Sequence, residues 1–132
     1  MGSNRYVTVL SMLVLACLAL PAHAADRMRA GQWVGTTIVG GKTYPTSNCM
    51  SKSDADQMNG DAKAVEAYLR KIIPPEACKI TDVKVDAQQV TYTASCGGGA
   101  PKVVTTTYHG DNFEGTDSTG AKIEGKLVGA CK

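Results

Sequence analysis

Short runs in which hydrophobic and polar residues alternate fill most of this chain, and that period of two is typical of β-strands. Residues 31–39 combine Trp, Val, Ile and Thr and end at Gly40-Gly41, a pair typical of two-residue hairpin turns. Residues 42–48 are therefore predicted to return as a second strand. Pro45 indicates that this strand is short or lies at a sheet edge, because proline has no backbone N–H to donate.

Five further strands are predicted after residue 78, near residues 79–86, 89–96, 102–109, 112–116 and 122–129. Short turns rich in Gly and Asp separate them, which favours antiparallel pairing over parallel crossovers. Ile80 is out of phase with Val83 and Val85, so we expect a bulge or a change of face within the first of these strands.

Between the second and third strands the hydrophobic period becomes helical. In Asp61–Ile73 the apolar residues share one helix face, and Pro74 ends the helix. These apolar residues are Val65, Tyr68, Leu69, Ile72 and Ile73. Ser51 followed by Asp54 predicts the N-cap of a shorter helix that stops at Asn59-Gly60.

These elements define an α+β fold class. We expect an antiparallel, curled or partly closed β-sheet of about seven strands, with a helical insertion after strand 2. Two disulfides, argued below, complete the expected architecture.

The first 24 residues have the features of a secretory signal peptide. An apolar run over residues 6–20 is followed by Pro21 and by Ala22-His23-Ala24, a small-x-small site that predicts cleavage before Ala25. The run of about 15 residues is shorter than the roughly 20 needed to span a bilayer. We therefore interpret residues 1–24 as a signal and residues 25–132 as one domain, periplasmic or secreted, with no transmembrane span.

Cys17 offers an alternative to simple export. The segment Val14-Leu15-Ala16-Cys17 is similar to the acylation site of lipoproteins, although Leu15 fits that site poorly. The later cleavage site favours a protein that is not anchored through Cys17.

Four cysteines remain after the signal: Cys49, Cys78, Cys96 and Cys131. An even number behind an export signal predicts disulfides. Zinc sites usually contain close cysteine pairs, whereas 28, 17 and 34 residues separate these four. Cys49 and Cys78 bracket the helical segment, and Cys96 and Cys131 are expected to share a buried sheet face. The predicted pairs are therefore Cys49–Cys78 and Cys96–Cys131.

The charge pattern argues against nucleic-acid binding. The 14 basic and 12 acidic residues give a net charge of +2 and are interspersed along the chain, so no basic patch is evident. We expect the protein to be a monomer.

His109 beside Asp111 suggests a weak hydrolase, but a catalytic triad needs three groups in a fixed geometry. A solvated turn histidine explains His109 better. The segment from Asp54 to Asp61 resembles a calcium loop, yet Met58 stands where an oxygen ligand is required. Helix capping explains these acidic residues, so we expect no metal, no cofactor and no catalytic residue.

Four aromatic residues are candidates for the lining of a cavity inside a curled sheet: Trp33, Tyr44, Tyr92 and Tyr108. Such a cavity would hold a small apolar ligand. The competing interpretation is plain core packing, because a small barrel is usually filled by its own side chains.

Five segments carry a resemblance to a known family: Met28–Trp33, Thr46–Ser51, Cys78–Asp82, Tyr92–Cys96 and Gly125–Cys131. In order and spacing the chain resembles the bacterial envelope proteins classed as domain of unknown function family 3617. Members often have a glutamate after the tryptophan and a methionine-rich stretch before the first cysteine, where this chain has Val34 and a short Gly-Gly turn.

The resemblance implies an exported protein of uncharacterised function and supplies no catalytic residues. Our hypothesis is a non-enzymatic binding or interaction module whose partner is a small apolar ligand or an envelope protein. The alternatives are a weak hydrolase that uses His109 and a structural cell-envelope factor.

Overall fold

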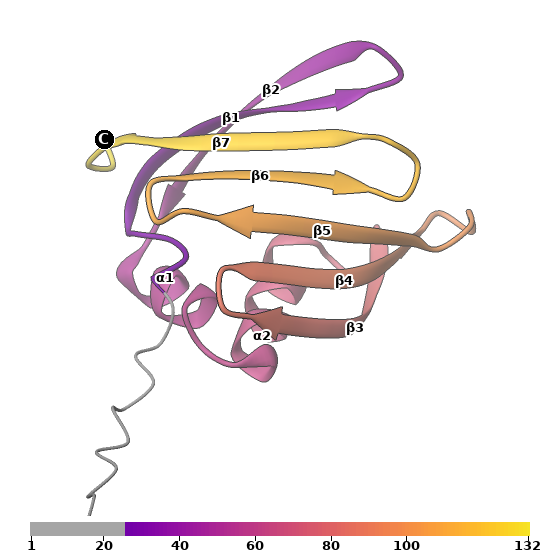
Figure 1. Cartoon of the computed structure of the whole chain (residues 1–132), viewed down its shortest axis with the longest axis horizontal. Coiled ribbons are helices and arrows are strands. Elements are labelled where there is room, and N and C mark those ends of the chain that lie inside the picture. Colours follow the sequence, from indigo (N-terminus) through magenta and orange to yellow (C-terminus); the bar gives the residue numbers. More distant parts are fainter. Residues whose placement is uncertain (1–25) are drawn as a thin grey trace, which may run out of the picture.

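The structure is a computed structural model that describes residues 26–132. The predicted signal, its cleavage site before Ala25 and Cys17 lie outside the described residues. The described part is a sheet with a helical segment packed against one face (Figure 1).

Seven strands form the sheet. They are β1 (Gly31–Val39), β2 (Lys42–Met50), β3 (Cys78–Asp86), β4 (Gln89–Cys96), β5 (Lys102–Tyr108), β6 (Asn112–Asp117) and β7 (Lys122–Gly129). Their order is β2-β1-β7-β6-β5-β4-β3, and every neighbouring pair is antiparallel. The prediction of a seven-stranded antiparallel sheet is confirmed.

The sheet is open, so the expectation of partial closure was wrong. Strands β2 and β3 form its two edges. The helical segment packs against the β3 end of the sheet and covers its inner face, which leaves the edges apart (Figure 1). Pro45 lies in β2, which confirms its expected place at an edge, although the strand is as long as β1.

Two helices follow β2, as predicted: α1 (Lys52–Met58) and α2 (Ala62–Ile72). The Ser51 hydroxyl accepts a 3.1 Å hydrogen bond from the backbone N–H of Asp54 and caps α1. Asp61 caps α2 through a 2.9 Å bond from the N–H of Ala64. The Asp54 carboxylate then accepts a 2.6 Å bond from Lys71, and this bond is the main cause that lowers its pKa. The two helices are therefore joined as one unit.

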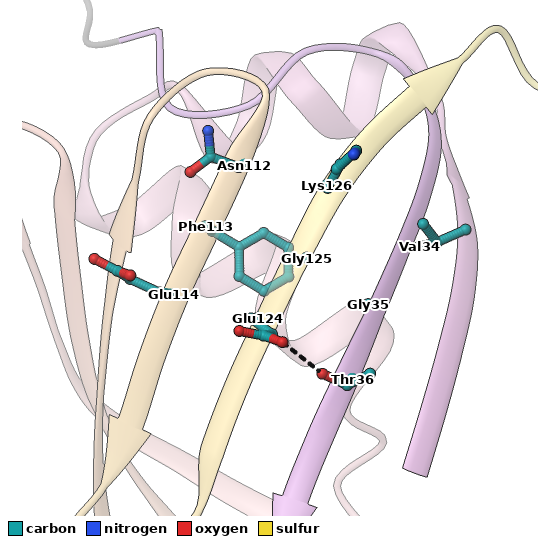
Figure 2. A pocket seen from close by; sticks show the side chains of 9 residues that line it. All are labelled: Val34, Gly35, Thr36, Asn112, Phe113, Glu114, Glu124, Gly125 and Lys126. Atoms are coloured by element: carbon teal, nitrogen blue, oxygen red, sulfur yellow. Dashed lines mark hydrogen bonds between the residues drawn. The ribbon is translucent and has the colours of Figure 1, made fainter. Parts of the chain in front are cut away.

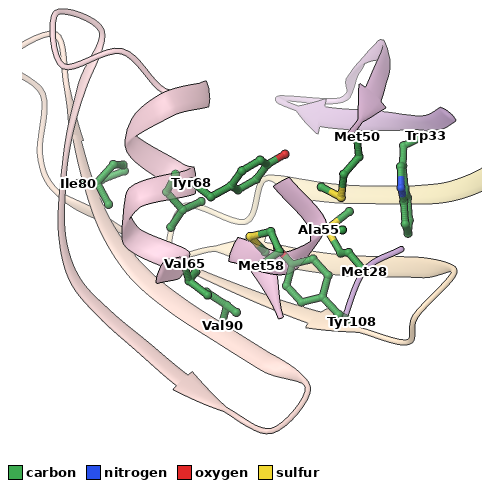
Figure 3. Packing of buried hydrophobic residues seen from close by; sticks show 12 residues of the cluster. Met28, Trp33, Met50, Ala55, Met58, Val65, Tyr68, Ile80, Val90 and Tyr108 are labelled. Carbon is green, nitrogen blue, oxygen red and sulfur yellow. The ribbon is translucent and has the colours of Figure 1, made fainter. Parts of the chain in front are cut away.

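Alternation along the strands assigns Trp33, Val90 and Tyr108 to the inner face, the face that the helices cover. There they meet the apolar sides of α1 and α2, including Met58, Val65, Tyr68 and Leu69 (Figure 3). The core thus lies between the helical pair and one half of the sheet.

The expected irregularity in the third strand is confirmed. The β3–β4 register shifts between Thr81 and Lys84, and Asp82 has a positive φ of 54°. One extra residue in an antiparallel strand changes the face of those that follow. This shift lets Ile80 and Val85 both pair with inner-face residues of β4.

The predicted disulfide pairs were wrong: the bonds join Cys49 to Cys131 and Cys78 to Cys96. Cys78 and Cys96 are direct partners in the β3–β4 register. Near the opposite edge of the sheet, Gln32 of β1 pairs with both Cys49 and Gly129. The ends of β2 and β7 therefore flank the same point of β1. Cys131 follows Gly129 by two residues and reaches Cys49 there.

Gly125 in β7 offers a direct test of the packing on the inner face. It pairs with both Gly35 and Phe113, and a Cβ atom added to it would overlap the Phe113 ring. We expect Gly125→Ala to lower the free energy of unfolding by about 1–3 kcal/mol, because the ring must leave its position among core side chains. Urea unfolding measures the change.

The matched control is Gly99→Ala in the β4–β5 loop. A Cβ at Gly99 meets only the carbonyl oxygen of Cys96, at 3.3 Å, so we expect a change within about 0.5 kcal/mol. Equal losses at the two positions would contradict the assigned packing of Phe113 on Gly125.

Candidate ligand-binding site

A cavity of about 210 Å³ lies between the helical pair and the inner face of the sheet. One part of its lining is a group of three aromatic rings from β1, β6 and β5, with β7 lying between β1 and β6. The Phe113 ring centroid is 5.7 Å from that of Trp33 and 5.6 Å from that of Tyr108. Strands β1, β5 and β6 therefore present three tilted rings to the same space.

Methionines supply another part of the lining. Met50 ends β2, Met58 ends α1 and Met28 precedes β1, and all three are buried. Figure 3 shows the Tyr68 side chain extending from α2 toward Met50. Leu69 and Ile72 of α2 also line the cavity, and Ile72 is half exposed. The cavity wall therefore combines rings with flexible, polarisable thioethers.

Three tyrosine hydroxyls provide the main polar groups of the lining. Burial raises the pKa of Tyr68 and, far more, that of Tyr108, while hydrogen bonds with Asn48 and Thr106 respectively oppose the rise. Burial also raises the pKa of Tyr92, and no hydrogen bond opposes it there. All three phenols are therefore neutral at physiological pH.

None of the residues that line this cavity carries a charge. The nearby cation Arg27 is buried, but its guanidinium donates to the backbone carbonyls of Met58, Gly60 and Ala87. The indole N–H of Trp33 is likewise occupied, by a 2.9 Å bond to the carbonyl of Arg29. The cavity is thus apolar, with few polar groups.

Three of the four aromatic residues proposed from the sequence line this cavity: Trp33, Tyr92 and Tyr108. Tyr44 does not line it. It pairs with Thr37 near the β1–β2 turn, at the end of the hairpin away from the helices, and is 51% exposed. Tyr44 thus lies on the inner face of the sheet, but at the end of β2 that is far from the cavity.

The lining residues that sequence reasoning missed include the three methionines and two further aromatic residues: Met28, Met50, Met58, Tyr68 and Phe113. The signal for Tyr68 was present, since it lies on the apolar face predicted for α2. Phe113 occupies an inner position by alternation in β6. The methionines lie at or beyond the ends of elements, where no period marks a buried face.

A second hollow, of about 420 Å³, lies on the outer face and is open to solvent (Figure 2). Glu114 and Glu124 are direct partners across β6 and β7, and the Thr36 hydroxyl donates a 3.1 Å hydrogen bond to Glu124. Lys126 adds a positive charge to the same lining. This mixed-charge surface has the character of a solvated sheet face.

His109 lies in the turn between β5 and β6, outside the lining of the apolar cavity. Its Nε2 is 3.8 Å from a carboxylate oxygen of Glu114, and the two side chains are 47% and 76% exposed. Asp111 beside it accepts a hydrogen bond from the side chain of Asn112. The imidazole is therefore solvated and paired with an exposed carboxylate.

Within residues 26–132, His, Cys, Asp and Glu side chains form no group of three or more that could hold a metal ion. The acidic residues near α1 have other contacts. Asp54 binds Lys71, Asp56 binds Lys52 at 2.8 Å, and Asp61 caps α2.

The comparison with family models is decisive for classification. The model described as Protein of unknown function (DUF3617) matches residues 28–131, almost all of the described chain. The chain belongs to the DUF3617 family. No curated protein and no solved structure matches this DUF3617 chain.

The DUF3617 match confirms the resemblance drawn from Gly31-Gln32-Trp33 and the four ordered cysteines. Both disulfides and the whole cavity lining lie inside the matched residues. Neither helix of the described part has the length and apolar character needed to cross a bilayer.

Proposed function

We propose that this DUF3617 protein is a non-enzymatic binding module, exported to the periplasm or secreted, that holds a small apolar ligand between its helical pair and its sheet. The observation that carries the proposal is the cavity of about 210 Å³ whose lining has no charged residue. Mostly apolar linings with a few placed polar groups are typical of small-molecule sites.

The size of the cavity supports binding of a ligand. A dry cavity of about 150 Å³ lined by Leu, Ile and Phe in another protein binds benzene. The cavity here is larger, and half-exposed Ile72 lies at its wall, so solvent and ligand have a route past the end of α2. A fully packed core would leave no such volume, because interiors rarely contain voids larger than a water molecule.

The disulfides support both the compartment and the site. Disulfides persist in oxidising compartments, which agrees with export. The Cys49–Cys131 bond joins the end of β2 to the chain beyond β7, and its neighbour Met50 lines the cavity. The bond therefore fixes one wall of the site.

Binding can be measured with 1-aminonaphthalene, an uncharged two-ring dye whose fluorescence shifts in apolar surroundings. We expect saturable binding of one dye per protein. Ile72→Trp should reduce the dye affinity at least fivefold, because the larger side chain occupies the cavity wall while the half-exposed position tolerates it.

The matched control is Val103→Trp, which adds the same group at a position that is 46% exposed and outside the cavity lining. It should leave the dye affinity unchanged, as should His109→Ala. Absence of dye binding by the oxidised, folded protein, or equal losses in the two Trp variants, would overturn the proposal. Specific cross-links to envelope proteins without dye binding would favour a structural factor.

A further inference from the structure

The dimensions of the cavity limit the ligand to a compact molecule. Its volume of about 210 Å³ exceeds the roughly 150 Å³ that accommodates benzene, and falls below the roughly 300 Å³ at which typical drug-sized sites begin. A ligand of one or two fused rings fits this range, whereas a long acyl chain exceeds it.

The lining favours a flat ring. The Phe113 ring is tilted against both the Trp33 and the Tyr108 ring, an arrangement that offers ring faces and edges for offset or edge-to-face contact. The methionine sulfurs make favourable contacts with aromatic rings, and their flexible side chains adapt to the ligand outline. An aromatic ligand therefore gains binding free energy from contacts with the rings and with the sulfurs, in addition to the gain from the apolar area that it buries.

The charges exclude ionic ligands. The lining has no charged side chain, and the one buried cation nearby, Arg27, is directed to three backbone carbonyls. A carboxylate, sulfonate or ammonium group placed here would lose its hydration without an ionic partner. The bound part of the ligand must therefore be neutral.

Tyr92 is one polar group of the lining that has unused hydrogen-bonding capacity. Asn48 and Thr106 lie beside the hydroxyls of Tyr68 and Tyr108, and the Trp33 indole donates to the carbonyl of Arg29. Within residues 26–132 the Tyr92 hydroxyl, which lines the same cavity, makes no side-chain hydrogen bond, and a phenol can both donate and accept one. A ligand hydroxyl or carbonyl placed beside Tyr92 would satisfy this group.

From this geometry we infer that the ligand is a small, uncharged aromatic compound of one or two rings with a single hydroxyl or carbonyl group that hydrogen-bonds to Tyr92. This assignment rests on the proposed function, since it names the chemical class that the same cavity takes. The rings lie against Trp33, Phe113 and Tyr108.

The test compares three probes on the oxidised protein by calorimetry: naphthalene, 2-naphthol and naphthalene-2-sulfonate. Trp33 is the sole tryptophan, so its indole N–H resonance reports binding in the cavity. We expect both neutral probes to shift this resonance, and the sulfonate to bind at least 100-fold more weakly than 2-naphthol.

Tyr92→Phe separates the hydrogen bond from the ring contacts. It should weaken 2-naphthol binding about three- to tenfold, the range expected for one neutral hydrogen bond, and change naphthalene binding less than twofold. Tyr44→Phe removes the hydroxyl of an exposed tyrosine outside the cavity and should change neither affinity.

The outcomes distinguish the ligand class from the binding function itself. If naphthalene and 2-naphthol bind but Tyr92→Phe affects both alike or neither, the assigned hydrogen bond is wrong while cavity binding stands. Sulfonate binding as strong as that of 2-naphthol would overturn the neutral class. If no probe shifts the Trp33 resonance or releases heat, the proposed function fails as well.

Discussion

Removal of the Cys49–Cys131 disulfide by the double substitution Cys49→Ala and Cys131→Ala should lower the free energy of unfolding by about 4.5 kcal/mol. The two cysteines are 82 residues apart, and a cross-link over so long a segment strongly restricts the unfolded chain. The second bond spans only 18 residues, so Cys78→Ala with Cys96→Ala should lower the free energy of unfolding by about 3.2 kcal/mol. Guanidinium unfolding without reductant measures both changes.

The two double variants control for each other, since each removes two thiols and one cross-link. The entropic argument predicts a difference of about 1.3 kcal/mol between them. A larger loss for the Cys78–Cys96 pair would show that native contacts at β3 and β4 outweigh the restriction of the unfolded chain. Peptide mapping of the oxidised protein checks the pairing itself, and a fragment joining Cys49 to Cys78 would contradict it.

The elements themselves were predictable from local pattern. Most strands are runs of β-prone residues bounded by short turns rich in Gly or Asp, and the predicted bounds agree with the structure to within two residues. The caps at Ser51 and Asp61 and the irregularity around Asp82 were also visible, because each depends on residues close together in the sequence.

Strand order was not predictable in the same way, and the disulfides depended on it. Alternation assigns a residue to a face but does not identify the neighbouring strand. The sequence brackets the helices with Cys49 and Cys78, yet β7 returns to lie beside β1 and brings Cys131 to Cys49. The same limit explains why Tyr44 was expected to line the cavity. Alternation shows which face of the sheet a residue occupies, but not how far along the hairpin it lies from the helices.

The burial of Arg27 is the feature of the fold that the local sequence pattern indicates least. Arg27 precedes β1, two residues before exposed Arg29, and nothing in the sequence distinguishes the two arginines. Yet Arg27 is only 4% exposed. Its Nε donates to the carbonyl of Ala87 at 2.7 Å, and its Nη1 donates to those of Met58 at 2.6 Å and Gly60 at 3.0 Å.

These bonds join three separate parts of the fold: the segment before β1, the end of α1 and the β3–β4 turn. Asn59 reinforces the junction, since its side chain accepts from the N–H groups of Arg27 and Met28 and donates to the Met28 carbonyl. Burial lowers the pKa of Arg27 from its usual value, but arginine remains charged at any physiological pH.

Arg27→Ala should therefore lower the free energy of unfolding by about 3 kcal/mol, because it leaves one buried and two partly buried carbonyls without their donor. Arg27→Met keeps most of the apolar volume and should lose nearly as much stability, since the unpaired carbonyls dominate the effect.

Arg29→Ala is the matched control. Its side chain is 60% exposed and pairs with Asp26 at 3.4 Å, so it should change stability by less than about 0.5 kcal/mol. Urea unfolding of the three variants decides the matter. If Arg27→Met were as stable as the parent protein, packing of the side-chain stem rather than the guanidinium bonds would hold the three segments together.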